Sequence, residues 1–159
     1  MINLKTKITQ IHYTRDPKGI LFGILKFCSY FYGIGSRLKN FLYDKNILKP
    51  KRVKAFVISV GNMTTGGVGK TPVVTEIARY LVQHGRRVAI VSRGYGGKLN
   101  NKHVNMISDG MSIFYDASDA GDEPFWLAEN NPGCYVFTCR NKYLASKFAV
   151  EKFGIDTIC

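Results

Sequence analysis

Hydrophobic and polar positions alternate along residues 55–159 in blocks that suit strands and helices in turn. Short apolar runs rich in β-branched residues are typical of strands buried in a sheet, and they occupy 55–60, 87–92 and 135–138. Apolar positions at helical spacing predict helices over 72–82, 124–128 and 141–153. Strand and helix in this order predict an α/β protein, with a mostly parallel sheet and flanking helices.

The pattern is weaker in two further stretches. Residues 98–120 are polar, with short strand-like pieces near 104–107 and 113–115. Residues 155–159 begin another apolar run, which stops at the last residue. Because this run has the start of a strand and nothing beyond it, we expect the α/β domain to be truncated.

An apolar, aromatic stretch runs from Ile20 to Ile34 ahead of these blocks. Lys26 interrupts it, and it is shorter than the ~18–20 uninterrupted apolar residues of a membrane-spanning helix. It predicts an amphipathic helix at a membrane surface, with its apolar face in the lipid and its Lys and Arg side chains at the phosphates. A core helix with a basic edge is the main alternative, and a secretory signal peptide is a third.

Positive charge is concentrated in the N-terminal third of the chain. Residues 1–54 contain 12 Lys and Arg and 2 acidic residues, which gives 12 − 2 = +10, whereas 55–159 contain 11 and 9, which gives 11 − 9 = +2. We therefore expect two parts, a basic, aromatic membrane-associating segment at 1–54 and a globular domain at 55–159. The basic segment suits an anionic partner, and its apolar stretch favours a lipid surface over nucleic acid.

A glycine-rich loop joins the first predicted strand to the first predicted helix. Such a loop turns backbone N–H groups around a phosphate, and the helix N-terminus adds its positive dipole end. Lys70 would reach the β- and γ-phosphates, and the Thr71 hydroxyl would bind Mg²⁺. The sequence therefore predicts a site for ATP and Mg²⁺ made by Thr64, Thr65, Gly66, Gly67, Val68, Gly69, Lys70 and Thr71.

This loop departs from the usual pattern at two positions. Thr64 stands where the pattern G-x-x-x-x-G-K-[ST] has its first glycine. Thr65 stands where the similar loop of partition-type ATPases has a signature lysine, which counts against an ATPase of the partition or metal-chaperone kind. That kind of ATPase, a purely structural turn, and an inactive membrane-binding fragment with a relic loop are the alternatives.

Four segments together resemble one family, the tetraacyldisaccharide 4′-kinases (lipid A 4′-kinases) of Gram-negative bacteria. They are Ser59–Pro72, Ser92–Lys98, Ala120–Pro124, and Tyr32-Gly33 with Leu42–Asp44. The resemblance covers essentially the whole chain, but only about the N-terminal half of such an enzyme. It implies that 55–159 is an incomplete P-loop kinase domain, without the Walker B residues and the C-terminal lobe.

The resemblance implies transfer of the ATP γ-phosphate to the 4′-hydroxyl of tetraacyldisaccharide 1-phosphate, which gives lipid IVA. The partners would be this acylated glucosamine disaccharide and the anionic cytoplasmic face of the inner membrane, where the enzyme would be peripheral. We expect neither a nucleic-acid partner nor an obligate protein partner.

The resemblance implies two catalytic residues. The family's catalytic base is the aspartate of its G-D-E-P motif, which is Asp122 here, and the second residue is the phosphate-binding Lys70. From spacing alone, Asp122 and Glu123 could instead cap the helix that follows. Glu123 is a further candidate Mg²⁺ ligand. Arg93 follows a strand, where parallel sheets place their ligands, so it is a candidate for binding a substrate phosphate, with a surface arginine as the alternative. Arg140 follows the next strand in the same way.

A P-loop enzyme normally holds Mg²⁺ with a second acidic residue at the end of a neighbouring strand. The family supplies it from a D-D-G-F-Q-H motif, which would follow Cys159. We therefore expect this polypeptide alone to transfer phosphate very slowly or not at all.

Overall fold

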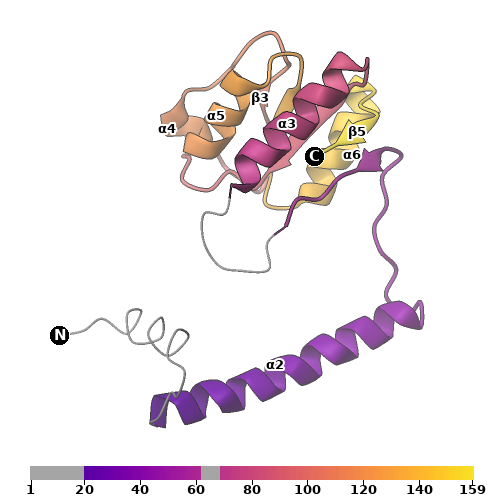
Figure 1. Ribbon diagram of the computed structural model, residues 1–159, viewed down its shortest axis with the longest axis vertical. Helices are drawn as coiled ribbons and strands as arrows, with labels where there is room; N and C mark the ends of the chain where they lie inside the picture. Colours follow the sequence, from indigo (N-terminus) through magenta and orange to yellow (C-terminus); the bar gives the residue numbers. More distant parts are fainter. Residues whose placement is uncertain (1–19, 62–68) are drawn as a thin grey trace, which may run out of the picture. The chain divides into compact units, whose positions relative to one another are not determined.

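The computed structural model describes residues 20–61 and 69–159. The chain divides into two compact units, Met1–Pro50 and Lys51–Cys159. The first unit contains helix α2 (Ile20–Asp44), and the second contains the sheet with its helices (Figure 1). The sequence predicts a boundary a few residues later, after Lys54, and the role of each part stays a prediction.

Helix α2 carries a continuous apolar stripe. The helix continues to Asp44, whereas the predicted apolar stretch ends at Ile34. Side chains at alternating steps of four and three residues share one face of a helix, and all seven on this face are exposed: Ile20, Ile24, Phe27, Phe31, Ile34, Leu38 and Phe41. No described side chain of α2 is buried within its unit. None of the described helices combines the length and hydrophobicity needed to cross a bilayer.

The second unit is built on a five-stranded sheet. Its strands lie in the order β1-β5-β2-β4-β3, with β1 at Phe56–Val57, β2 at Val88–Ser92, β3 at Asn105–Ser108, β4 at Tyr135–Thr138 and β5 at Thr157–Ile158. All pairs are parallel except β3 with β4. The predicted mostly parallel α/β sheet is confirmed, and one edge strand runs antiparallel.

Helices cover both faces of this sheet (Figure 1). They are α3 (Lys70–Gln83), α4 (Ala117–Ala120), α5 (Asp122–Asn130) and α6 (Lys142–Phe153). Because side chains alternate along a strand, Ile90 of β2 packs with α3 and α5, whereas its neighbour Val91 packs with α6. Phe137 of β4 lies on the α6 face, with its ring 5.8 Å from that of Phe153. The three layers explain why β2 is buried along its whole length.

Several predicted elements differ in detail. The strand predicted at 55–60 is the two-residue edge strand β1, whose Phe56 and Val57 are 64% and 54% exposed, because its ladder partner is β5 on one side. The piece near 113–115 forms a single bridge, Ser108 with Ile113. Helix α4 was not predicted, and its N-terminus is capped by Asp116, which accepts a hydrogen bond from the Asp119 N–H at 3.0 Å.

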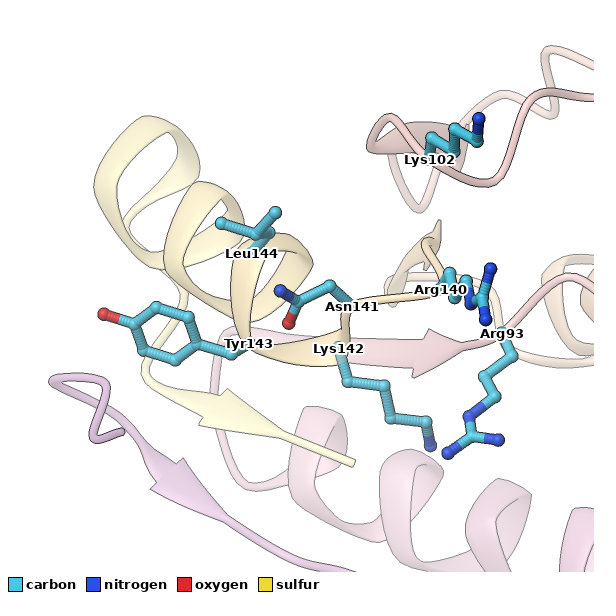
Figure 2. A pocket seen from close by; sticks show the side chains of 7 residues that line it. All are labelled: Arg93, Lys102, Arg140, Asn141, Lys142, Tyr143 and Leu144. Atoms are coloured by element: carbon cyan, nitrogen blue, oxygen red, sulfur yellow. The ribbon is translucent and has the colours of Figure 1, made fainter. Parts of the chain in front are cut away.

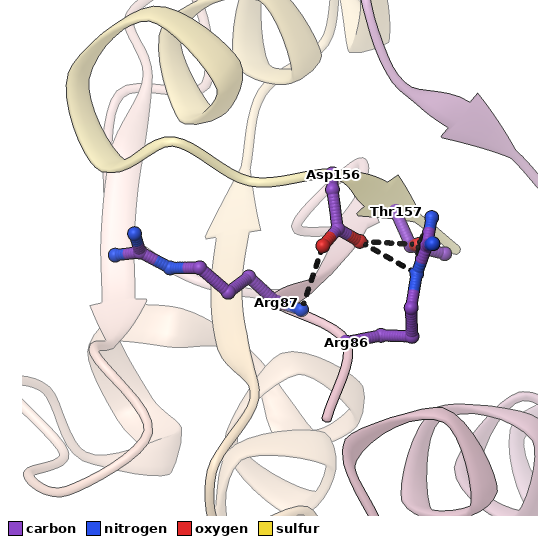
Figure 3. Close-up of polar contacts among 4 residues, drawn as sticks. All are labelled: Arg86, Arg87, Asp156 and Thr157. Atoms are coloured by element: carbon purple, nitrogen blue, oxygen red, sulfur yellow. Dashed lines mark hydrogen bonds and ion pairs between the residues drawn. The ribbon is translucent and has the colours of Figure 1, made fainter. Parts of the chain in front are cut away.

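A polar cluster ties the beginning of β5 to the beginning of β2 (Figure 3). The Asp156 carboxylate pairs with Arg86 Nε at 3.0 Å and accepts from the Arg87 N–H at 3.2 Å and from the Thr157 hydroxyl at 2.7 Å. Burial raises the pKa of Asp156. The hydrogen bonds from Thr157 and Arg87 and the charge of Arg86 together lower it by more, so the pKa lies below the ordinary value of 3.8. The cluster fixes which strand ends lie side by side.

Candidate active site

A cavity of about 630 Å³ lies where β1, β2 and β5 end and α3 begins. Ligand sites of open α/β sheets form at the carboxyl ends of the strands, because the loops diverge there. Polar side chains line this cavity together with an apolar floor from the strands, and they are Ser59, Lys70, Thr71, Ser92, Arg93, Tyr95, Glu123, Lys142 and Ser146. The cavity therefore has the setting expected of a nucleotide site, and we call it the nucleotide cavity.

The start of α3 places two of the predicted nucleotide-binding residues at this cavity. Gly69 occupies the N-cap position with φ +73°, in the left-handed region that glycine adopts readily, and Lys70 and Thr71 form the first helical turn. The Thr71 hydroxyl donates a hydrogen bond to Glu123 Oε1 at 3.0 Å. The other predicted loop residues, Thr64, Thr65, Gly66, Gly67 and Val68, lie outside the described residues.

Two glycine turns bring Arg93 and Glu123 to one cavity. The turn after β2 packs backbone to backbone on the turn before α5, and both contacts depend on glycine. A Cβ on Gly121 would lie 2.5 Å from the Tyr95 carbonyl oxygen, and a Cβ on Gly97 would collide with the Asp119 carbonyl. The segments Ser92–Lys98 and Ala120–Pro124 are therefore packed against each other, a contact that the sequence alone does not indicate.

Asp122 and Glu123 begin α5, but they are placed differently. Glu123 lines the nucleotide cavity, whereas Asp122 is not among the described residues that line it, although both residues are exposed. Gly121 occupies the N-cap position of α5 and offers no side-chain cap. Asp122 is the first helical residue, so it is not the cap that spacing alone suggests. Its role as a base stays a prediction.

A second cavity of about 710 Å³ lies beside the first and is strongly basic (Figure 2). Four of the described residues that line it are cationic and none is acidic. The lining is made by Arg93, Lys102, Arg140 and Lys142, together with Asn141, Tyr143 and Leu144. Arg93 and Lys142 line both cavities. Desolvation of its ammonium at the cavity wall and the neighbouring charge of Arg93 lower the pKa of Lys142, although the residue as a whole is exposed, and the charge of Glu123 opposes them.

Sequence reasoning missed Lys142. It is the first residue of α6 and comes shortly after β4. The argument that singled out Arg93 and Arg140, a position just beyond a parallel strand, would also have found it.

Two oxygen ligands suited to Mg²⁺ face each other at the start of α3 and α5. The Thr71 hydroxyl and the Glu123 carboxylate are 3.0 Å apart, and hard cations prefer such donors. No cluster of three His, Cys, Asp or Glu able to hold a metal occurs in the part of the chain that the structure describes. The pair fits Mg²⁺ that takes its remaining ligands from phosphate oxygens and water.

A mostly parallel sheet, a glycine-rich sequence between a strand and a helix, and a cavity where that helix begins together define a P-loop α/β protein. The sequence model of the family "Tetraacyldisaccharide-1-P 4′-kinase" matches residues 21–159. The chain therefore belongs to this family.

Individual relatives agree. The chain is 44% identical over 143 residues to the tetraacyldisaccharide 4′-kinase of Desulfotalea psychrophila, with 90% of this chain and 41% of that protein covered. It is 43% identical over 144 residues to the kinase of the same name from Syntrophus aciditrophicus, with 91% and 37% covered. The chain thus spans about two fifths of the length of these curated relatives.

A solved structure shares the fold. The crystal structure described as the "apo" form of LpxK from Aquifex aeolicus in complex with ATP superposes with a TM-score of 0.74 at 35% sequence identity. The match covers 87% of this chain and 43% of that chain.

Proposed function

We propose that this chain forms the nucleotide-binding part of a kinase that phosphorylates the 4′-hydroxyl of tetraacyldisaccharide 1-phosphate, giving lipid IVA. The observation that carries the proposal is the Thr71–Glu123 contact of 3.0 Å, at a cavity that Lys70 and Arg93 also line. Family membership supplies the acceptor, and the relative solved with ATP supports the phosphate donor.

The proposed reaction moves one phosphoryl group. The bond between the γ-phosphorus and the β–γ bridging oxygen breaks, a bond from the 4′-oxygen to that phosphorus forms, and ADP leaves. The hydroxyl proton passes to a carboxylate, for which we propose Asp122, whose exposed position leaves it accessible to the acceptor hydroxyl. Lys70 neutralises the phosphate oxygens as their charge is redistributed.

Thr71 and Glu123 would hold Mg²⁺ when it is bound. The metal supplies charge neutralisation for the phosphate oxygens. The chain's own contribution is to keep a hydroxyl and a carboxylate together although 52 positions separate them, which the packed Gly97 and Gly121 turns make possible.

We also propose that α2 places the enzyme on the cytoplasmic face of the inner membrane as a peripheral protein. The exposed stripe from Ile20 to Phe41 suits the acyl region of a lipid monolayer. Residues 1–54 carry +10 (12 − 2), which attracts anionic lipid headgroups. This placement would bring the domain to an acylated substrate that resides in the membrane.

Calorimetry with Mg·ATP on the folded chain tests the nucleotide site. We expect measurable binding that Lys70→Ala abolishes or weakens by at least about tenfold, because a charge-assisted contact to phosphate contributes about 1.5–3 kcal/mol. Lys98→Ala, a change of another exposed lysine outside the cavity, is the control and should bind like the wild type. Equal binding by wild type and Lys70→Ala would refute the assignment.

A further inference from the structure

The side chains of Arg93 and Lys142 form the boundary between the nucleotide cavity and the basic cavity. Both residues line both cavities, although Arg93 follows β2 and Lys142 begins α6. In Figure 2 the ammonium end of Lys142 and the guanidinium of Arg93 point toward one another. The fold has therefore brought two positive charges together from separate elements.

This arrangement is electrostatically unfavourable in the protein alone. Desolvation is the largest cause of the lowered pKa of Lys142, the charge of Arg93 is the second, and the charge of Glu123 opposes both. Ion pairs among the described residues join Glu76 with Arg79, Asp156 with Arg86, and Glu151 with Lys147, so neither boundary cation forms a close ion pair there. Arg93 donates instead to the neutral Tyr95 hydroxyl at 3.0 Å.

An anion between the two side chains would relieve their repulsion. A phosphate monoester carries up to two negative charges and several acceptor oxygens, which a planar guanidinium and a compact ammonium can bind together. Arg140 and Lys102 extend the positive field on the basic side of the boundary, which favours an anion over a neutral polar group.

We propose that Arg93 and Lys142 jointly bind one phosphate group at this boundary, and that Lys142 is a substrate-binding residue of the site. This inference rests on the proposed function for its setting and goes beyond it in naming Lys142. The phosphate has two possible sources, the terminal group of ATP in one cavity or a sugar phosphate in the other. In both cases the chemistry of recognition is the same.

Titration of the full chain with inorganic phosphate, followed by NMR, tests the pair itself. We expect Lys142→Met to weaken phosphate binding about tenfold or more, and Lys142→Arg to retain it, because the positive charge is kept. The matched control is Lys147→Met on the same helix, whose ammonium lies 3.7 Å from Glu151 and which lines neither cavity. Wild type that binds no phosphate, or equal losses in Lys142→Met and Lys147→Met, would overturn the proposal.

Calorimetry with ATP, ADP and glucosamine 1-phosphate then identifies the source. If the boundary holds the terminal phosphate, Lys142→Met weakens ATP about tenfold and leaves ADP unchanged. If it holds a sugar phosphate, the loss falls on glucosamine 1-phosphate, and ATP is unchanged. Either result supports the pair, whereas unchanged affinity for all three probes contradicts it.

Failure of the proposed function would look different. A wild-type chain that binds no Mg·ATP, but whose phosphate titration still depends on Lys142, would refute the nucleotide site and keep this inference. Thermal melting of Lys142→Met should match the wild type, because the residue is exposed at a helix start.

Discussion

Asp122 and Glu123 are adjacent residues in different surroundings. Successive positions on a helix are rotated by about 100°, so neighbours face different directions. Glu123 accepts a hydrogen bond from Thr71 in the lining of the nucleotide cavity, and Asp122 lies outside that lining, although both residues are exposed. We therefore propose separate roles, metal binding for Glu123 and proton acceptance for Asp122.

Glu123→Gln should weaken Mg·ATP binding while Asp122→Asn leaves it unchanged. A neutral amide in place of Glu123 keeps a partner for Thr71 but removes a carboxylate ligand, and we expect a loss of about tenfold, or roughly 1.4 kcal/mol. Calorimetry with and without Mg²⁺ measures this. An equal loss in Asp122→Asn would contradict the division of roles.

Asp156 shows how one carboxylate can make stability depend on pH. Its folded pKa lies below the ordinary 3.8, so the unfolded chain takes up the proton first as pH falls. The stabilisation is therefore present above about pH 4 and is lost as pH falls through the lower, folded pKa.

We expect Asp156→Asn to reduce the free energy of unfolding by about 1 kcal/mol at pH 7, since the cluster is half-exposed and screened by solvent. The difference from wild type should shrink toward pH 3, as measured by urea denaturation at several pH values. Glu151→Gln, which removes an exposed pair at 3.7 Å, is the control and should change little. A penalty for Asp156→Asn that stays constant with pH would contradict this assignment.

At the scale of elements, two turns assemble the site. The turn after β2 and the turn before α5 touch through glycines that leave no room for a side chain. This contact, and not the length of either helix, sets the position of Glu123 relative to Thr71.

Gly121→Ala should destabilise the domain more than Gly96→Ala. Both glycines have positive φ, +93° and +86°, a strained conformation that costs alanine about 1–3 kcal/mol. Only at Gly121 does the added Cβ also meet backbone, 2.5 Å from the Tyr95 oxygen, which adds about 1–3 kcal/mol. Urea denaturation measures both variants, and equal losses would show that the turns do not need this close approach.

Elements with strong local patterns were predicted closely. β4 has its predicted bounds, Tyr135–Thr138, and α6 begins one residue after the predicted start. The short helix α4 was missed because its polar sequence lacks apolar periodicity and depends on the Asp116 cap. The exposure of β1 was missed because a strand's burial depends on its place in the sheet, which its own residues do not specify.

At the scale of the whole molecule, two units carry different chemistry. Met1–Pro50 contains the exposed apolar stripe of α2, and Lys51–Cys159 contains the nucleotide cavity. If each unit performs its own task, substitutions in one unit should impair membrane binding alone, and substitutions in the other should impair Mg·ATP binding alone.

Phe27→Ser with Phe31→Ser should abolish binding to anionic vesicles and leave Mg·ATP affinity unchanged. Each ring buried in lipid contributes about 2 kcal/mol, so the double change should weaken partitioning more than about a hundredfold. Tyr32→Ser, which alters an exposed aromatic residue beside the stripe, is the control. Lys70→Ala should show the reverse pattern, and vesicle sedimentation beside calorimetry would reveal any cross-effect that contradicts it.

The sequence by itself determined the alternation of strands and helices, the charge concentrated before residue 55, and the Gly69-Lys70-Thr71 end of the phosphate loop. These features are local, because periodicity and neighbouring residue types are enough to specify them. Only the tertiary structure decided that Thr71 meets Glu123 and that Arg93 faces Lys142. Those meetings depend on the strand order β1-β5-β2-β4-β3 and on turns packed without side chains, and both arise from contacts between distant parts of the chain.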